Sequence, residues 1–356
     1  MAGIENITQL SNLLNASGVS IDKHTNEWFM RVKKGSTDYL PFLTTEYYLQ
    51  TALQADDAGC RAILKQIIPD IREFDTAECE LKDPLGEEKF SPFPRFVHRY
   101  EDRALILVTD RCAMYCRHCF RRSFSGGING PLSDAELTPM AGYLAEHREI
   151  NEVLLTGGDP LTLSNERLFK IIARIKSVRP ELVVRVCSRM PVVNPDRISR
   201  ALADGLGSYE GIWFVTHFNH AAELTEYSRA AVRRLLAAGI PVLNQSVLLK
   251  GVNDDLSSLK ELFQKLLRFG VKPYYLFQGD LARGTSHLRV PLRRALELTS
   301  KLKYEISGMA MPRFAVDLPG GGGKITLPSQ SHPVDDEGEF YIIKGLDNEE
   351  YRYPAN

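Results

Sequence analysis

The stretch Ala104-Leu-Ile-Leu-Val-Thr-Asp-Arg-Cys112-Ala-Met-Tyr-Cys116-Arg-His-Cys119 joins a short apolar run directly to three closely spaced cysteines. The run Ala104–Thr109 is short and rich in aliphatic residues, which is typical of a buried strand. The cysteines therefore lie on a polar loop at the end of that strand. Because binding loops follow the carboxyl ends of parallel strands, this arrangement predicts an α/β fold with a site at that edge.

Similar apolar runs recur along the chain, at residues 152–156, 182–187, 211–216, 242–249 and 272–277. Amphipathic segments separate them, for example Leu256–Leu267, with Asp254 or Asp255 as N-cap and Gly270 as terminator. Strands that alternate with helices indicate parallel β/α units. Six such units favour a partial (β/α)6 barrel over an open sheet, although strand order is not visible in a sequence. Distinctive residues follow these strands as well: Gly157-Gly158-Asp159, Ser188-Arg189 and His217.

Three segments are expected. Residues 1–90 are predicted to form an N-terminal helical segment, and the Pro-rich stretch Ser91-Pro-Phe-Pro-Arg95 marks its end. Residues 91–318 form the predicted partial barrel. Residues 319–356 form a short C-terminal extension, which begins with Gly320-Gly-Gly-Gly323 and contains a strand-like piece at Phe340–Ile343.

Composition excludes several classes of protein. The 356 residues carry 44 Lys+Arg against 45 Asp+Glu, a formal net charge of −1, which argues against nucleic acid as a partner. Hydrophobic residues make up 44%, as expected of a globular chain. No apolar stretch approaches the roughly 18 residues of a membrane helix. The N-terminus lacks the pattern of a secretion signal, so we expect a soluble cytoplasmic protein without a membrane partner.

The cysteines have the spacing C-x3-C-x2-C. Three thiolates on a tight loop can hold three irons of a [4Fe–4S] cluster and leave the fourth iron without a protein ligand. One alternative is a structural zinc site completed by His118 or a distant cysteine, but such sites usually combine two C-x2-C pairs and this chain has no second pair. Three buried core thiols are a poorer alternative, because Arg117 and His118 make the loop polar.

The cysteine pattern after a first barrel strand is similar to the signature of the radical S-adenosylmethionine (SAM) superfamily. The longer string Cys112-Ala-Met-Tyr-Cys-Arg-His-Cys-Phe-Arg-Arg122 resembles the lysine 2,3-aminomutase family. Further similar motifs follow in the family's order: Thr156-Gly-Gly-Asp159, Thr216-His-Phe-Asn-His220, Asn244-Gln-Ser-Val-Leu248, Pro273-Tyr-Tyr275 and Asp317-Leu-Pro-Gly-Gly-Gly-Gly-Lys324. The resemblance covers about two thirds of the chain.

The resemblance implies three cofactors: a [4Fe–4S] cluster, SAM and pyridoxal 5′-phosphate (PLP). In that family the cluster cleaves SAM to a 5′-deoxyadenosyl radical, and PLP carries the migrating amino group. The residues implied as cluster ligands are Cys112, Cys116 and Cys119. Those implied at the SAM site are Gly157, Gly158, Asp159, His217 and Gln245. On residue type alone, the glycines also fit a tight turn, and the histidine also fits a structural role.

Lys324 is the implied partner of PLP, with which a lysine forms an imine, and it is the candidate catalytic residue. The adjoining glycines would give it mobility. By composition alone a glycine run reads as a flexible linker, but the preceding Asp317-Leu-Pro matches the family. Arg99 and Arg103 match the family's ligands of the PLP phosphate, and the planar donors of arginine suit that group.

The resemblance also implies a substrate. Arg121 matches the residue that holds the α-carboxylate of the amino acid, and Asp280 and Asp317 match two carboxylates around a distal ammonium. Two acids favour a cationic side chain and repel a glutamate. We therefore expect an isomerase that converts L-lysine to β-lysine. Arginine, glutamate or a lysine of translation elongation factor P remain alternative substrates, and a radical SAM enzyme without PLP or a zinc-stabilised binding protein remain alternative functions.

The sequence departs from the pattern of the longer family members. Asp255 stands where they carry a zinc-binding cysteine, and no cysteine follows Cys187, so no zinc is predicted. Phe277 replaces a tyrosine near the PLP. The expected partners are a small amino acid, an electron donor such as flavodoxin or ferredoxin, and further copies of the chain in a homo-oligomer.

Overall fold

The computed structural model describes residues 3–34, 39–127, 129–327 and 334–355. A nine-stranded sheet forms its centre, with the strands in the order β11-β10-β9-β8-β7-β6-β5-β4-β3. The strands, in chain order, are β3 Phe96–Tyr100, β4 Arg103–Thr109, β5 Glu152–Gly157, β6 Val183–Cys187, β7 Ile212–Thr216, β8 Val242–Val247, β9 Lys272–Phe277, β10 Arg313–Leu318 and β11 Gly323–Thr326.

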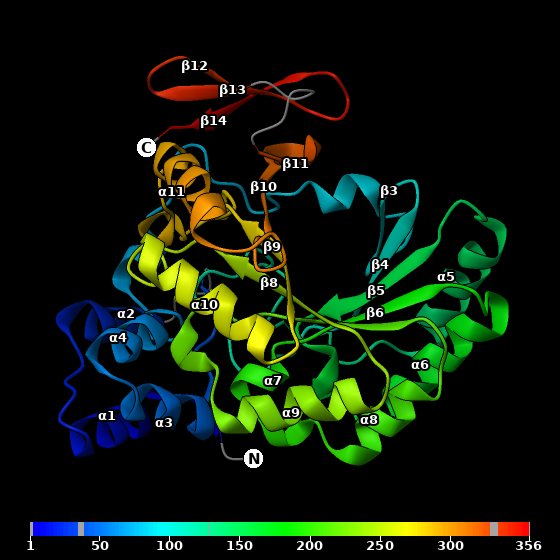
Figure 1. The fold of residues 1–356 in the computed structure, drawn as a ribbon, viewed down its shortest axis with the longest axis horizontal. Helices are drawn as coiled ribbons and strands as arrows, with labels where there is room; N and C mark the ends of the chain where they lie inside the picture. The colour runs from blue at the N-terminus through cyan, green and yellow to red at the C-terminus, as the bar shows by residue number, and fades with distance from the viewer. Residues whose placement is uncertain (1–2, 35–38, 128, 328–333, 356) are drawn as a thin grey trace.

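Neighbouring strands from β4 to β10 pair in parallel, while β3 and β11 are antiparallel at the two edges. The sheet is curled, and its two edge strands do not pair with each other in the described part of the chain, so the predicted partial barrel is confirmed (Figure 1). All six predicted strands are present. A seventh parallel strand, β10, was not predicted, because Arg313 and Asp317 interrupt its apolar pattern.

Helices lie along the outer side of the curled sheet (Figure 1). In α10 the apolar residues at helical spacing, Leu259, Leu262 and Leu266, are buried. The carboxylate of Asp255 caps this helix by accepting from Ser258 N–H. The helices that follow strands are α5 Asp134–Glu146, α6 Asn165–Val178, α7 Met190–Val193, α8 Arg200–Gly207, α9 Glu226–Ala237, α10 Leu256–Arg268 and α11 Leu292–Glu305. Short 3-10 helices are η1 Ile71–Phe74, η2 Glu87–Phe90, η3 Pro160–Thr162, η4 Pro195–Arg197, η5 Ala221–Glu223, η6 Ser286–Leu288 and η7 Pro319–Gly321.

Helices of the N-terminal part of the chain lie beside the cysteine loop and hold it. This segment contains α1 Ile7–Ala16, β1 Gly3–Ile4, α2 Lys23–Lys33, β2 Thr44–Thr45, α3 Glu46–Gln54 and α4 Asp57–Lys65. Within the loop, Tyr115 N–H donates to the carbonyl of Leu43 (3.0 Å), and Arg117 N–H donates to the carbonyl of Gln66 (2.9 Å). Two backbone hydrogen bonds therefore connect the cysteine loop to this segment.

The C-terminal extension forms a separate antiparallel sheet of β12 Val334–Asp336, β13 Phe340–Lys344 and β14 Glu350–Pro354, which lies at the top of Figure 1. The hydroxyl of buried Tyr353 donates to the carbonyl of Gly279 (2.9 Å), and Leu346 N–H donates to the carbonyl of Gly322 (3.1 Å). The division at residues 318/319 remains a prediction, and the central sheet continues across it through β11.

Candidate active site

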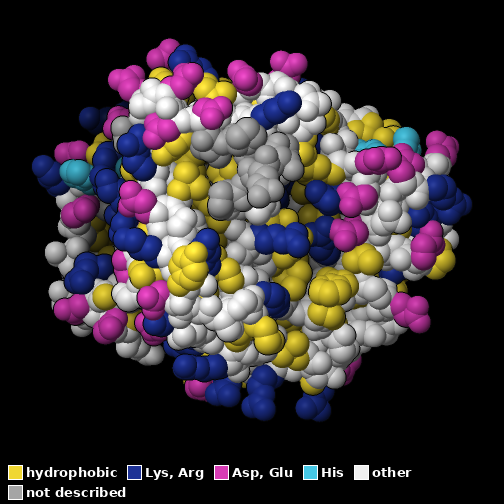
Figure 2. All heavy atoms as spheres, turned by 45° about the horizontal axis from the view of Figure 1, so that its top comes forward, with side chains coloured by type: hydrophobic (Ala, Val, Ile, Leu, Met, Phe, Trp, Pro, Cys, Tyr) yellow, Lys and Arg dark blue, Asp and Glu magenta, His cyan; other side chains and the backbone are white. Residues whose placement is uncertain are grey.

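One cavity of about 620 Å³ is lined by residues at the carboxyl ends of the parallel strands and by residues from within the strands, such as Arg103 and Arg185. Every site residue predicted from the sequence lines it: Arg99, Arg103, Cys112, Cys116, Cys119, Arg121, Gly157, Gly158, Asp159, His217, Gln245, Asp280, Asp317 and Lys324. Lys and Arg side chains gather near the middle of the face seen in Figure 2, beside hydrophobic ones. Segments far apart in the sequence thus converge on one space.

The three cysteines of the loop face this cavity together. Burial raises the pKa of Cys112 and of Cys119, and neighbouring cysteines raise both further. Three thiols at one surface are the soft donor set that an iron–sulfur cluster takes. The loop therefore fits a [4Fe–4S] cluster, with Cys112, Cys116 and Cys119 as the residues that would hold it.

A buried ion-pair network fixes the cysteine loop from behind. Arg117 is 0% exposed, and its Nε donates to Glu73 Oε1 (2.8 Å). Arg122 Nη2 donates to Glu73 Oε2 (2.6 Å), and Arg117 Nη1 donates to the carbonyl of Pro41 (2.9 Å). Burial alone would raise the pKa of Glu73, but the two guanidinium groups lower it. Glu73, on η1, therefore compensates two arginines of the cysteine loop.

We expect Glu73→Gln to destabilise the protein by about 3 kcal/mol, because a buried arginine loses its counter-charge. Urea unfolding of the purified apoprotein measures this, and iron content after reconstitution should fall with it. Glu78→Gln, an exposed glutamate of the same segment, is the matched control. Equal stability of the E73Q variant and the control would contradict the role of Glu73 in holding the loop.

Arg189 is a buried residue of this site. It lies just after β6, but its position in the sequence does not reveal its partners. Its Nη1 donates to Cys116 Sγ (2.9 Å), and its Nη2 donates to Glu223 Oε1 (2.8 Å) and Gln66 Oε1 (2.5 Å). The contact with Cys116 fixes the guanidinium of Arg189 beside one of the predicted cluster ligands. The glutamate and glutamine partners come from distant parts of the chain, so no local sequence signal identifies this network.

The glycine segment after β5 has a packing reason for its residue types. A Cβ on Gly158 would lie 2.2 Å from the carbonyl oxygen of Arg111, and Gly157 has φ of +119°. Asp159 accepts hydrogen bonds from Leu161 N–H (2.9 Å), Ser188 Oγ (2.8 Å) and Arg189 N–H (2.9 Å). These contacts join the ends of β4, β5 and β6, so the tight-turn interpretation holds, and contact of these residues with SAM stays a prediction.

His217 and His118 stack on each other, with ring centroids 5.4 Å apart. Burial, followed by the charge of Arg189, lowers the pKa of His217 to about 3, and burial lowers the pKa of His118 well below its usual value. Both rings are therefore neutral near pH 7. His118 Nδ1 is buried without a hydrogen-bond partner among the described residues, so this polar atom is available to a ligand.

Arg99 and Arg103 lie on β3 and β4. Arg99 Nε and Nη2 are buried and have no hydrogen-bond partner in the described ranges of the chain. Orphaned guanidinium donors in a cavity wall suit a phosphate, which accepts several hydrogen bonds. Arg103 Nη1 donates to Asp102 Oδ1 (2.8 Å). The two arginines fit the phosphate group of PLP. Arg99 would bind it through Nε and Nη2, which have no partner among the described residues.

Lys324 lies on β11 directly opposite Asp317 of β10. Its Nζ is 3.9 Å from Asp317 Oδ2, 5.1 Å from the ring centroid of Tyr275 and 4.5 Å from that of Phe277. The linker interpretation of the glycine run is wrong, because Pro319–Gly321 forms the 3-10 helix η7 in a tight turn between the two strands. This turn directs Lys324 into the cavity.

The three predicted substrate residues also line the cavity. Burial, followed by the charge of Asp317, raises the pKa of Asp280 to about 8. Arg121 forms a bidentate ion pair with Glu87, a residue that the sequence analysis did not single out. Two acids and an arginine thus line the cavity that would receive an amino acid.

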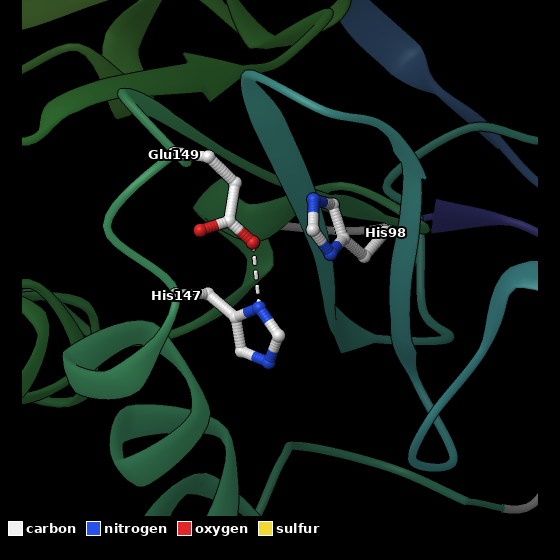
Figure 3. A group of neighbouring side chains, drawn as sticks. All are labelled: His98, His147 and Glu149. Carbon is white, nitrogen blue, oxygen red and sulfur yellow. Dashed lines mark hydrogen bonds and ion pairs between the residues drawn. The ribbon is translucent and has the colours of Figure 1, made fainter.

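A second group of metal-ligand types, His98, His147 and Glu149, lies near the β3 edge of the sheet (Figure 3). His147 Nδ1 is 2.6 Å from Glu149 Oε1, and the ring of His147 stacks on that of Tyr143. His98 Nδ1 is 3.0 Å from the hydroxyl of Tyr143, and its Nε2 is 3.2 Å from the carbonyl of Glu101. These contacts attach β3, which carries Arg99, to α5.

A curled parallel sheet with C-x3-C-x2-C after its first parallel strand defines a radical SAM protein, and residues 106–264 match the family described as "Radical SAM superfamily". The chain is 43% identical to the L-lysine 2,3-aminomutase of Clostridium subterminale over 81% of this chain and 70% of that enzyme. It belongs to the lysine 2,3-aminomutase family of isomerases.

Two further similar proteins are an aminomutase named for another amino acid and a protein of known structure. The glutamate 2,3-aminomutase of Clostridioides difficile is 36% identical over 95% of this chain and 78% of that enzyme. The crystal structure of Streptococcus suis SuiB bound to S-adenosylmethionine has a TM-score of 0.47 at 11% identity, over 64% of this chain and 52% of that one. Within the described ranges, no helix is both long and apolar enough to cross a membrane.

Proposed function

We propose that this protein is a PLP-dependent radical SAM 2,3-aminomutase that converts L-lysine to β-lysine. One observation carries the choice of substrate: Asp280 and Asp317 face the same cavity as Lys324, and Asp317 is the counter-ion of its amine. A cavity in which one acid pairs with an ammonium and a second acid lies in the same wall suits a further ammonium on a substrate side chain. A glutamate side chain would be repelled there.

The three cofactors, when bound, supply the radical and the route for amino migration. The protein groups hold and orient them. Cys112, Cys116 and Cys119 would hold the cluster, and Gly157, Gly158, Asp159, His217 and Gln245, which line the same cavity, would contact SAM. Arg99 on β3 and Arg103 on β4 would hold the PLP phosphate, and Lys324 on β11 would supply the amine that binds PLP.

The substrate would be held at both of its ends. The guanidinium of Arg121 binds the α-carboxylate, and Asp280 with Asp317 binds the distal ammonium. Fixing two ends of a flexible amino acid places its β-carbon reproducibly, which radical chemistry requires for selectivity. We further propose a cytoplasmic homo-oligomer that receives electrons from a flavodoxin or ferredoxin, without nucleic acid or membrane as a partner.

Anaerobic reconstitution with iron, sulfide and PLP, followed by SAM, dithionite and a panel of lysine, arginine and glutamate, tests the proposal. Chromatography of the products should show β-lysine, and a Cys116→Ala variant should give none, since it lacks a cluster ligand. Another β-amino acid would contradict the assignment of Asp280 and Asp317. No product from any of the three free amino acids would shift the proposed substrate to a protein-bound lysine.

A further inference from the structure

Glu87 and Arg121 form a two-point ion pair in the wall of the cavity. Arg121 Nε lies 3.0 Å from Glu87 Oε2, and Nη2 lies 2.6 Å from Oε1. The side chains are only 13% and 18% exposed, so water screens the pair weakly. Arg121 Cζ also lies 4.4 Å from the ring centroid of Phe120. These contacts fix the plane of the guanidinium group.

The ion pair uses one edge of the guanidinium and leaves the other open. Arg121 Nη1 makes no hydrogen bond to any residue in the described part of the chain. Nη1 and the second hydrogen of Nη2 form a planar fork that matches a carboxylate. Arg121 lines the cavity, and this edge is the part of its guanidinium that has no partner among the described residues.

Glu87 also belongs to a segment that packs against the turn preceding Lys324. Lys89 Nζ donates to the carbonyl of Gly320 (2.8 Å), and Gly320 N–H donates to the carbonyl of Pro84 (3.0 Å). Gly86 has φ of +64°, and a Cβ there would lie 2.9 Å from Gly320. The segment therefore connects the carboxylate of Glu87 with the glycine turn.

We propose that Glu87 is a positioning residue: it orients Arg121 so that the free Nη1–Nη2 edge receives the α-carboxylate of the amino acid. This inference rests on the proposed function, in which Arg121 binds that carboxylate. The ion pair cancels the charge of Arg121 in the empty cavity. Recognition of the carboxylate then depends on the direction of the free donors, and Glu87 sets that direction.

A competing role for Glu87 predicts the opposite result. If Glu87 occupied the place of the substrate carboxylate, the substrate would have to displace it, and removing its charge would strengthen binding of carboxylates. If Glu87 positions Arg121, removing its charge weakens that binding. The glutamine amide keeps one acceptor oxygen but places an N–H donor group where the second oxygen accepted, so the two-point contact that orients the guanidinium is lost.

Equilibrium dialysis of the reconstituted holoenzyme, without reductant so that no turnover occurs, distinguishes the two roles. The probes are L-lysine and L-lysinamide, which differ only at the carboxylate. We expect the wild type to bind L-lysine more tightly than L-lysinamide. The ratio of the two affinities should be about tenfold smaller in Glu87→Gln. Glu88→Gln, an exposed neighbour on the same 3-10 helix, should keep the wild-type preference.

An unchanged or increased preference in Glu87→Gln would overturn the inference and leave the proposed function intact. A wild type that binds acid and amide equally would show that Arg121 is no carboxylate site, and it would overturn both. Should Glu87→Gln not fold, Glu87→Asp is the substitute, since it retains the charge but not the reach. Its expected preference lies between those of the wild type and the glutamine variant.

Discussion

Replacement of Lys324 by alanine is expected to lower the rate of β-lysine formation by about three orders of magnitude or more, as for other residues on which a covalent step depends. The amine of Lys324 enters the cavity from β11 and is held beside Asp317. No other lysine lines this cavity among the described residues, so its loss is not compensated. Chromatographic assay of product from the reconstituted variant measures the effect.

Cleavage of SAM serves as the internal control for this variant. The cysteine loop follows β4 and is held by the N-terminal segment, and no hydrogen bond between described residues joins it to Lys324. Reductive formation of 5′-deoxyadenosine should therefore persist in Lys324→Ala. Lys301→Ala, an exposed position on α11, should behave as the wild type. Unimpaired turnover by Lys324→Ala would indicate a radical SAM enzyme that does not use PLP.

The parts of the fold that could be predicted from the sequence are those with a local signal. The six apolar strands and α10 show it directly, because periodicity and caps are set within a few residues. β10 escaped prediction because it carries Asp317 toward the cavity. A polar residue within a strand breaks the apolar pattern where the strand contributes to the site.

The candidate site shows the same division between local and distant contacts. Its motif residues were predicted, and one cavity brings all of them together. The residues that hold them were not: Glu73 compensates Arg117, and Glu87 pairs with Arg121, from segments 44 and 34 residues away. Such pairs depend on the tertiary fold, so the charges of a single sequence do not reveal them.

Asp280→Asn is expected to raise the KM for lysine about 100-fold, because an ammonium in a buried site loses one of its two counter-charges. In the empty site, burial and then the charge of Asp317 raise the pKa of Asp280 to about 8. Asp280 is therefore mostly protonated at pH 7, and a cationic side chain must displace that proton to bind. Steady-state kinetics across a pH series measures both effects.

The KM of the wild type for lysine should fall as the pH rises toward 8. Below pH 8 each unit of increasing pH should lower the KM of the wild type up to about tenfold, since more of Asp280 is ionised before binding. The KM should level off above pH 8. In Asp280→Asn this slope should disappear, whereas Asp204→Asn, an exposed acid on α8, should retain it. A wild-type KM that is flat between pH 6 and 8 would contradict the coupling of Asp280 to the substrate ammonium.

Asp280→Asn should raise the free energy of unfolding although it weakens the binding of lysine. The pKa of Asp280 in the folded protein lies above its ordinary value of 3.8, so its contribution to stability is fully present below pH 3.8 and is lost as the pH rises toward 8. Asparagine carries no charge and avoids this loss. Asp280→Asn should therefore exceed the wild type in free energy of unfolding by roughly 2–4 kcal/mol at pH 9 and by much less at pH 5. Urea titrations of the apoprotein at the two pH values test this. If Asp280→Asn is less stable than the wild type at pH 9, the ionised carboxylate of Asp280 has stabilising partners in the folded protein, which would contradict the prediction.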